Sequence, residues 1–345
     1  MNPIKTAVLG ASGYTGIELL RLLLSHPMVE LTSITSRANA GSKLSAVIPR
    51  FAGLAGADLE FVAPDVNAVV ESGAEVAFLA LPHGMAAEFA LPLLEQGLRV
   101  IDLSADFRLN EAAVYEEFYG QVHPAPEWLA KAVYGMPELY EEAIKESQLI
   151  AAPGCYPTSI ILPLVPLLRA GLVDSSSIVV SSLSGVSGAG RTASLPLIFA
   201  EVNESLRAYG LPKHRHLSEI EQELSLAASQ KVTITFTPHL VPVTRGIHST
   251  ISATLTGDFS QVGDALRSAY QEQPFVRLLG EGIAADTAHV TRTNFLDIGW
   301  HHDARTHRLL LTSAEDNLTK GASGQAIQAF NLLYKLPSTA GLLNI

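Results

Sequence analysis

Residues 6–24 read TAVLGASGYTGIELLRLLL, and this stretch decides the fold. A short apolar run over residues 6–9 leads into the glycine turn GASGYTG, residues 10–16, and then into Ile and Leu residues at helical spacing. In a dinucleotide-binding βα unit such glycines permit a tight turn and let a pyrophosphate approach the helix N-terminus. The spacing G-x-x-G-x-x-G is a variant of the usual fingerprint, so a glycine turn without a ligand is the alternative.

The next predicted strand, residues 29–35, ends in Ser36 and Arg37, where a dinucleotide-binding sheet holds the adenosine ribose. NAD sites commonly have Asp or Glu at this place, whereas a hydroxyl and a guanidinium suit a 2′-phosphate. We therefore predict NADP(H) as the cofactor. The alternative is that Arg37 is a solvent-exposed loop residue, as most arginines are.

Strand and helix patterns continue to alternate over residues 76–81, 85–95 and 100–103. This alternation predicts a parallel sheet, whose ligands bind outside the carboxyl ends of the strands. His83, Ser104 and Arg108 follow such ends, although His83 is more simply explained by packing beside a cofactor than by catalysis. Residues 110–147 are less regular, and we expect loops and short helices that join two domains.

A second sheet is indicated by alternating apolar and polar residues over 231–255, 296–300 and 309–312. If one side of it packs on another subunit, the protein is an oligomer. The helix predicted within residues 316–331 carries small residues at close-packing positions, and we return it to the first domain. The predicted fold is therefore α/β: a Rossmann-type NADP-binding domain (1–148 and 316–345) and an α+β catalytic and oligomerisation domain (149–315) with a mostly antiparallel or mixed sheet.

Cys155 is the only cysteine among 345 residues and lies in AAPGCYPTS, residues 151–159. A single thiol cannot form a disulfide within the chain. A strand-like run, a Pro-Gly turn and a helix start surround it, and a helix N-terminus favours the nucleophilic thiolate. Cys155 is thus a candidate for covalent catalysis, against the alternative of a small buried apolar residue.

His214 and His216 precede an amphipathic helix, and Glu219 lies one turn beyond His216. Three interpretations compete: a metal site, a solvated helix start, or a general acid/base beside Cys155. A metal is disfavoured because no third histidine has a matching spacing, and the histidines after residue 300 suggest an exposed polar hairpin. We predict no metal ion.

Composition excludes several classes of function. The chain has 23 Lys and Arg against 34 Asp and Glu, and a net charge of −11 argues against a nucleic-acid surface. Neither a secretory signal nor an apolar run of the ~18 residues that a membrane span needs is present, so we expect a cytoplasmic protein. The patterns G-x-S-x-G and G-x-x-x-x-G-K-[ST] are both missing, which disfavours a serine hydrolase and a P-loop phosphotransferase.

Eight motifs, spread in order over nearly the whole length, resemble one family. They are GASGYTG, ALPHG, DLSADFRL, PGCYPT, SGVSGAGR, HRHLSEI, TPHLVPVTRGI and DNLTKGASGQA. Together they are similar to the N-acetyl-γ-glutamyl-phosphate reductase family of arginine biosynthesis, in the aspartate-semialdehyde dehydrogenase-like superfamily. Aspartate-semialdehyde dehydrogenases share the glycine turn and the thiol but not PGCYPT followed by HRH.

The resemblance implies NADPH-dependent reductive dephosphorylation of N-acetyl-γ-glutamyl phosphate to N-acetylglutamate 5-semialdehyde, the third step of arginine biosynthesis from N-acetylglutamate. Cys155 would attack the acyl phosphate and form a thioester, which hydride would then reduce. Either His216 or His214 would be the acid/base. The helix geometry with Glu219 favours His216.

The remaining site residues are assigned by motif and chemistry. Substrate binding is expected of Arg108, Arg245 and Ser184, because a bidentate Arg suits carboxylate and phosphate. Cofactor binding is expected of Gly10, Ser12, Gly13, Tyr14, Thr15, Gly16, Ser36, Arg37, His83, Gly188, Asn317 and Lys320.

Other functions stay open at this point. They are a related acyl-phosphate reductase of aspartate-semialdehyde or aminoadipyl type, a non-catalytic NADPH-binding redox sensor, and a thiol hydrolase or acyltransferase without hydride chemistry. The expected partners are a small acyl phosphate and further copies of the chain, as a homodimer or homotetramer. No nucleic acid or membrane is expected.

Overall fold

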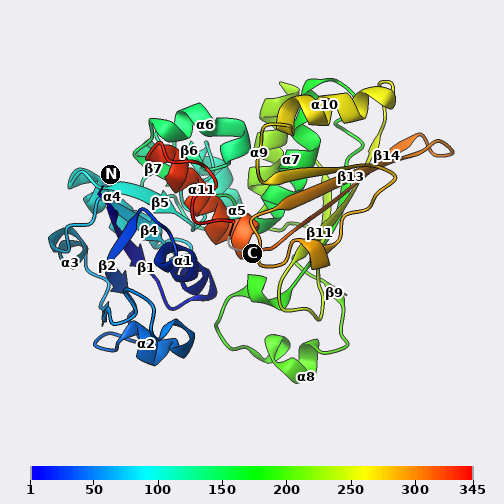
Figure 1. Cartoon of the computed structure of the whole chain (residues 1–345). Helices are drawn as coiled ribbons and strands as arrows, with labels where there is room; N and C mark the ends of the chain where they lie inside the picture. Colours follow the sequence, from blue (N-terminus) through cyan, green and yellow to red (C-terminus); the bar gives the residue numbers. More distant parts are fainter. Residues whose placement is uncertain (1, 344–345) are drawn as a thin grey trace. The chain divides into compact units, whose positions relative to one another are not determined.

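The computed structural model describes residues 2–343, which form two compact units (Figure 1). The first unit holds the described residues of Met1–Ala113, Gln121–Pro153 and Ala322–Ile345. The second unit holds Val114–Gly120 and Gly154–Gly321. The domain boundaries inferred from the sequence, 148/149 and 315/316, stay a prediction.

The first unit is built on a seven-stranded sheet in the order β3-β2-β1-β4-β5-β7-β6. Every pairing in it is parallel. The strands are β1 (Ile4–Leu9), β2 (Val29–Thr35), β3 (Phe61–Val62), β4 (Val76–Leu79), β5 (Arg99–Asp102), β6 (Val133–Tyr134) and β7 (Leu149–Ala151). All four residues of β4 are buried, as expected for a sheet covered on both faces. The predicted α/β class with a Rossmann-type sheet is confirmed.

The helices of this unit are α1 (Tyr14–Leu24), α2 (Leu44–Val47), α3 (Val66–Glu71), α4 (Ala86–Glu95), α6 (Pro137–Lys145) and α11 (Gly324–Leu333), while α5 (Ala112–Tyr119) spans the division between the units. Residues 110–147 contain the expected short helices, α5, η2 (Pro126–Trp128) and α6, but they also contain the unexpected strand β6, which forms an edge of the first sheet, and α6 packs on α11. A two-residue strand leaves no periodicity to detect. Pro137 is the first residue of α6, a position at which proline is favoured.

The glycine turn follows β1 and leads into α1, as its sequence predicts. Gly10 has a φ of +78°, and a Cβ there would lie 2.2 Å from the carbonyl oxygen of Ala80. A Cβ on Gly16 would lie 2.5 Å from the carbonyl oxygen of Gly10. Both positions therefore exclude a side chain. Gly13 caps α1, which places the N–H groups of its first turn at the carboxyl end of β1.

The second unit contains a mixed seven-stranded sheet in the order β12-β13-β14-β11-β8-β10-β9. β8 is parallel to β10 and β12 to β13, whereas the other pairings are antiparallel. Its strands are β8 (Val179–Ser184), β9 (Arg207–Ala208), β10 (Thr235–Leu240), β11 (Ile247–Thr254), β12 (Val276–Glu281), β13 (Leu296–Asp303) and β14 (Arg308–Glu315). Side chains of β11 alternate between buried and partly exposed, and the predicted second sheet is confirmed.

Helix α7 (Cys155–Arg169) is the buried centre of this unit and packs against α9 (Leu217–Ala228), α10 (Ser260–Tyr270), β11 and β14. It runs on through Pro163 and Pro166. Each proline lacks an N–H, which leaves the carbonyls of Ser159 and Leu162 without their helical donors. The hydroxyl of Ser313 donates to the first of these carbonyls at 2.5 Å, and that of Tyr270 donates to the second at 2.7 Å.

Two buried carboxylates lie at the end of strand β5 and just after it, Asp102 and Asp106. Asp102 accepts the N–H and the hydroxyl of Ser104, both at 2.8 Å. Asp106 accepts the N–H groups of Gly84 and Ala86 and so fixes the turn after β4. Burial, and next the charge of Asp106, raises the pKa of Asp102 to about 7.

This raised pKa predicts a pH-dependent stability. Asp102 binds a proton more tightly in the folded than in the unfolded chain, so the free energy of unfolding falls as pH rises from about 4 to 7, by on the order of 3 kcal/mol. Asp102→Asn removes the titrating group, and its thermal unfolding midpoint should fall less than that of the wild type between pH 5 and 7.5. The exposed Asp58→Asn is the control. Equal pH dependence in all three proteins would contradict the assignment.

Candidate active site

Cys155 is the first residue of α7 and is partly exposed to solvent. Gly154 precedes it as the N-cap in an extended conformation, with φ −72° and ψ 162°. The thiol therefore lies at the positive end of a 15-residue helix, where the backbone dipole and the first N–H groups favour the thiolate.

His216 and Glu219 lie directly against the residue before the thiol. A Cβ on Gly154 would be 2.6 Å from His216 Nε2 and 2.7 Å from Glu219 Oε1. The N–H of Gly154 donates to Glu219 Oε2 at 3.0 Å. Nε2 of His216 lies 3.9 Å from Oε1 of Glu219, too far for a hydrogen bond but close enough for an ionic interaction with a protonated imidazole. Glu219 thus contacts both the cysteine turn and the imidazole.

His214 is half-buried, like His216. Burial, and to a lesser degree the charge of Arg215, lowers its pKa to about 4. Its Nδ1 accepts the N–H of His216 at 3.1 Å, which requires that nitrogen to be unprotonated. His214 is therefore neutral at neutral pH, and its ring packs edge-on against that of His216 at 5.0 Å.

Two tyrosines that the sequence analysis did not single out lie beside these groups. Their hydroxyls are 2.8 Å apart, between Tyr156 and Tyr209. Burial is the main cause that raises the pKa of both tyrosines, and the charge of the nearby Cys155 contributes to the rise, which takes the pKa of Tyr209 to about 12. Tyr156 follows Cys155 directly in the motif PGCYPT, so the sequence alone could have suggested it as a site residue. Tyr209 was not, because pairing of β9 with β10 brings it from 53 residues away.

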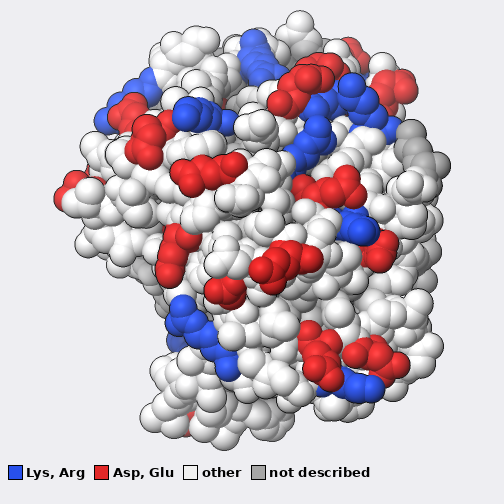
Figure 2. All heavy atoms as spheres, turned by 90° about the vertical axis from the view of Figure 1, so that its left-hand side faces the viewer, with Lys and Arg blue, Asp and Glu red and all other residues white. Residues whose placement is uncertain are grey.

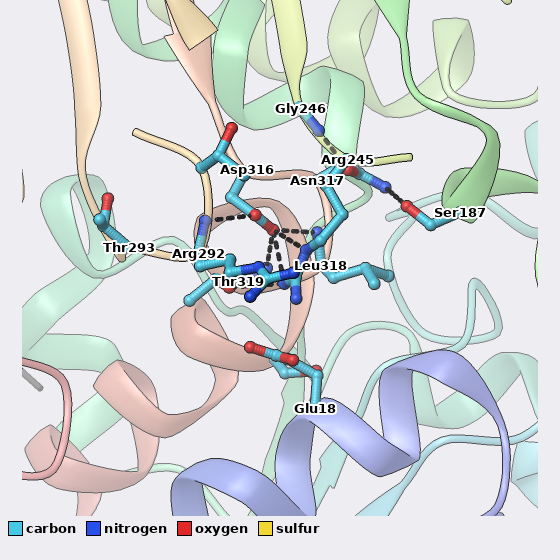
Figure 3. A network of polar contacts seen from close by, with 12 residues as sticks. Glu18, Ser187, Arg245, Gly246, Arg292, Thr293, Asp316, Asn317, Leu318 and Thr319 are labelled. Atoms are coloured by element: carbon cyan, nitrogen blue, oxygen red, sulfur yellow. Dashed lines mark hydrogen bonds and ion pairs between the residues drawn. The ribbon is translucent and has the colours of Figure 1, made fainter. Parts of the chain in front are cut away.

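Arg245, a predicted substrate ligand, is held by a buried carboxylate (Figure 3). Its Nη2 donates to Asp316 Oδ1 at 2.8 Å and to the hydroxyl of Thr319 at 2.9 Å. Asp316 also accepts backbone N–H groups of Arg292, Leu318 and Thr319. The guanidinium is thus part of the framework of the loop after β14, and its role toward substrate stays a prediction.

Four predicted ligands lie in two segments of the second unit: Asn317 and Lys320 follow β14, and Ser184 and Gly188 lie at and after the end of β8. Asn317 receives the N–H of Gly246 at 2.8 Å and donates to the hydroxyl of Ser187 at 3.0 Å, as Figure 3 shows. Ser184 ends β8, and its hydroxyl would be 3.3 Å from a Cβ on Gly188. Lys320 is fully buried. Asn317 therefore links two loops of this unit.

In the first unit, the predicted nucleotide residues Ser12, Gly13, Tyr14, Thr15 and Gly16 form the turn into α1. The hydroxyl of Ser12 lies 2.9 Å from that of Ser36, which also accepts a hydrogen bond from Asn39. Ser36 is thereby tied to the turn. Arg37 is exposed, and within residues 2–343 its guanidinium makes no hydrogen bond or ion pair.

The other two predicted ligands of this unit differ in their exposure to solvent. Arg108 is 6% exposed, and its guanidinium donates to the carbonyls of Ala152 at 2.8 Å and Leu103 at 3.0 Å. It supports the chain just before the cysteine turn. His83 is exposed in the loop that Asp106 fixes. Both roles toward ligands stay predictions.

Some sites do not occur in the described part of the chain. Between residues 2 and 343, no three His, Cys, Asp or Glu side chains gather in a way that would hold a metal ion. No helix in that range combines the length and apolar character needed to cross a membrane. On the face drawn in Figure 2, acidic and basic side chains are interspersed, and neither sign forms an unbroken field.

The chain matches two family descriptions. Residues 5–147 match the NAD binding domain of semialdehyde dehydrogenase, and residues 155–317 match the semialdehyde dehydrogenase dimerisation domain. Similar solved structures include aspartate semialdehyde dehydrogenase II from Vibrio cholerae (TM-score 0.73, 18% identity, 97% of this chain and 99% of that one). Another is aspartate semialdehyde dehydrogenase with NADP from Candida albicans (TM-score 0.69, 17% identity, 96% and 98%). These matches define the class as semialdehyde dehydrogenase-like.

Curated relatives narrow the class. An N-acetyl-gamma-glutamyl-phosphate reductase from Akkermansia muciniphila is 57% identical over 99% of both chains. One from Geobacter metallireducens is 51% identical over 98% of both. The chain belongs to the N-acetyl-gamma-glutamyl-phosphate reductase family, and the resemblance inferred from its eight motifs is confirmed.

The pKa of His214 gives a prediction specific to this site. Because burial disfavours its charged form, the imidazole should stay neutral down to about pH 5 and titrate near pH 4. NMR of ¹⁵N-histidine-labelled protein measures this midpoint, and the resonance missing from His214→Gln assigns it. A midpoint between 6 and 7 would show that solvent reaches the ring.

Proposed function

We propose that the protein catalyses the NADPH-dependent reductive dephosphorylation of N-acetyl-γ-glutamyl phosphate to N-acetylglutamate 5-semialdehyde. Family membership supports the substrate. The observation that carries the chemistry is the lone thiol at the N-terminus of α7, with His216 and Glu219 against the adjoining Gly154. Such a thiol is equipped for acyl transfer.

In the proposed mechanism the Cys155 thiolate attacks the acyl carbon, the bond to the phosphate oxygen breaks, and phosphate leaves a thioester. NADPH, when bound, supplies the hydride that reduces this thioester. His216 protonates the resulting oxygen and later removes that proton, so that the C–S bond breaks and aldehyde and thiolate separate. The N–H of Cys155 stabilises the oxyanion. His214, neutral at working pH, positions His216 through its backbone N–H.

Glu219 is proposed as a positioning residue because its carboxylate holds the N–H of Gly154 and faces the imidazole. Arg108, Arg245 and Ser184 are proposed to contact the substrate's carboxylate and phosphate. For Arg245 this requires a donor beyond those that Asp316 and Thr319 already use.

The glycine turn fits a dinucleotide-binding unit, because Gly10 and Gly16 allow backbone segments to pack closely in the turn that leads into the N-terminus of α1. We propose that the turn residues 10–16 bind the pyrophosphate and that Ser36 and Arg37 bind the 2′-phosphate. His83, Gly188, Asn317 and Lys320 are proposed as further cofactor contacts.

We also propose a cytoplasmic homodimer or homotetramer, supported by the match of residues 155–317 to a dimerisation domain. The specific alternatives are acyl phosphates of the aspartyl or aminoadipyl type. Assaying the reverse reaction, with each semialdehyde, NADP⁺ and phosphate, separates them. A tenfold or greater preference in kcat/KM for an aldehyde other than N-acetylglutamate 5-semialdehyde would overturn the proposed substrate.

Cys155→Ser should abolish this turnover and leave NADPH binding nearly unchanged, because the thiol forms the covalent bond but contributes little to the nucleotide site. Absorbance at 340 nm measures turnover, and fluorescence titration measures the dissociation constant of NADPH. The thioester route is wrong if the variant keeps a tenth or more of the wild-type kcat.

Arg37→Ala should weaken NADPH binding roughly ten- to a hundredfold, the equivalent of one charge-assisted hydrogen bond, while NADH binding hardly changes. Lys43→Ala, an exposed cation of the same region, is the matched control. The test is kcat/KM for both cofactors in all three proteins. An unchanged ratio in the Arg37 variant would show that other residues hold the 2′-phosphate.

A further inference from the structure

Residues 191–213 of the second unit form a segment that we call the arm. It contains η4 (Leu195–Leu197), α8 (Phe199–Val202) and β9, and in Figure 1 α8 lies away from the sheet of its unit. Nearly all of its residues are exposed or partly exposed. Five of the fourteen exposed large apolar side chains among the described residues lie in it: Leu195, Ile198, Phe199, Leu206 and Leu211.

The arm is nevertheless an ordered structure. Arg207 Nη2 donates to the carbonyl of Pro196 at 2.6 Å and closes the arm on itself. At its base, Ala208 pairs with His239 of β10, and the hydroxyl of Tyr209 lies 2.8 Å from that of Tyr156. Phe199, which is 81% exposed, is thus presented to solvent by a segment fixed at its base.

An ordered apolar surface of this kind indicates an interface, because exposed clusters of large apolar side chains on soluble proteins mark binding sites. The charge of the arm favours a second copy of this chain as its binding partner. The whole chain carries −11, which opposes self-association, but the arm carries three basic and two acidic residues and is nearly balanced. A segment with so little net charge does not repel a symmetry-related copy of itself.

We infer that the arm docks on a second copy of this chain, through the apolar surface formed by Leu195, Phe199 and Leu206. This inference rests on the proposed homo-oligomer and adds the surface through which its copies contact each other. It is consistent with the position of the arm inside residues 155–317, the part that matches a dimerisation domain. The two-fold relation of such an interface places the arm of each copy against its partner.

The test is the double variant Phe199→Glu/Leu206→Glu, measured by sedimentation velocity over 0.1–50 µM full-length protein. Each buried charge in an apolar interface should weaken association by roughly thirtyfold or more, so the variant should shift to smaller species that the wild type does not populate. Leu54→Glu/Val122→Glu, at comparably exposed positions of the first unit, should leave assembly unchanged.

The outcomes separate the two claims. A monomeric wild type would overturn the proposed oligomer, and with it this interface. If the wild type is an oligomer and the arm variant is equally oligomeric, the arm is not the interface of that oligomer. A different protein would then be the partner of the arm. If the Glu variant fails to fold by circular dichroism, Phe199→Ala/Leu206→Ala is measured in the same way. Hydrogen exchange of residues 195–206 should slow with protein concentration in the wild type only.

Discussion

The contact on which the site depends is the packing of His216 and Glu219 onto the Cα of Gly154. Any side chain at this position would overlap the imidazole nitrogen at 2.6 Å and the carboxylate oxygen at 2.7 Å. Because Gly154 is also the N-cap of α7, one residue fixes both the start of the helix that carries the thiol and the position of the His216 imidazole, the proposed acid/base. In the proposed mechanism, the same turn therefore fixes both the electrostatic activation of the thiol and the geometry of proton transfer.

A second constraint is the buried carboxylate of Asp316. It receives a guanidinium and three backbone N–H groups, which offsets the cost of removing a charge from water. These bonds hold the loop between β14 and α11, which brings Gly321 so near that a Cβ there would lie 2.9 Å from Cys155 Cβ. The loop thus forms one wall beside the cysteine, and the polar network keeps that wall in place.

The sequence predicts most of this architecture because its signals are local. Strand β2 lies at 29–35 as predicted, and the helix start at Cys155 follows from the Pro-Gly turn before it. Edge strand β6 was missed because two residues carry no period. Tyr209 and the network around Asp316 were missed because their contacts join segments distant in sequence, which a single sequence does not reveal. The site residues read from motifs stay predictions until they are mutated.

The two prolines of α7 have a mechanical consequence. Ser313 of β14 and Tyr270 of α10 donate to the carbonyls that these prolines leave open, so the helix is pinned to its neighbours at two points along its axis. Sliding or rotating α7 would strand two buried carbonyls, at about 1–3 kcal/mol each. These two hydrogen bonds therefore fix the position of the helix along its axis. They also fix the position of the thiol at its N-terminus, one and two turns before the bonded carbonyls.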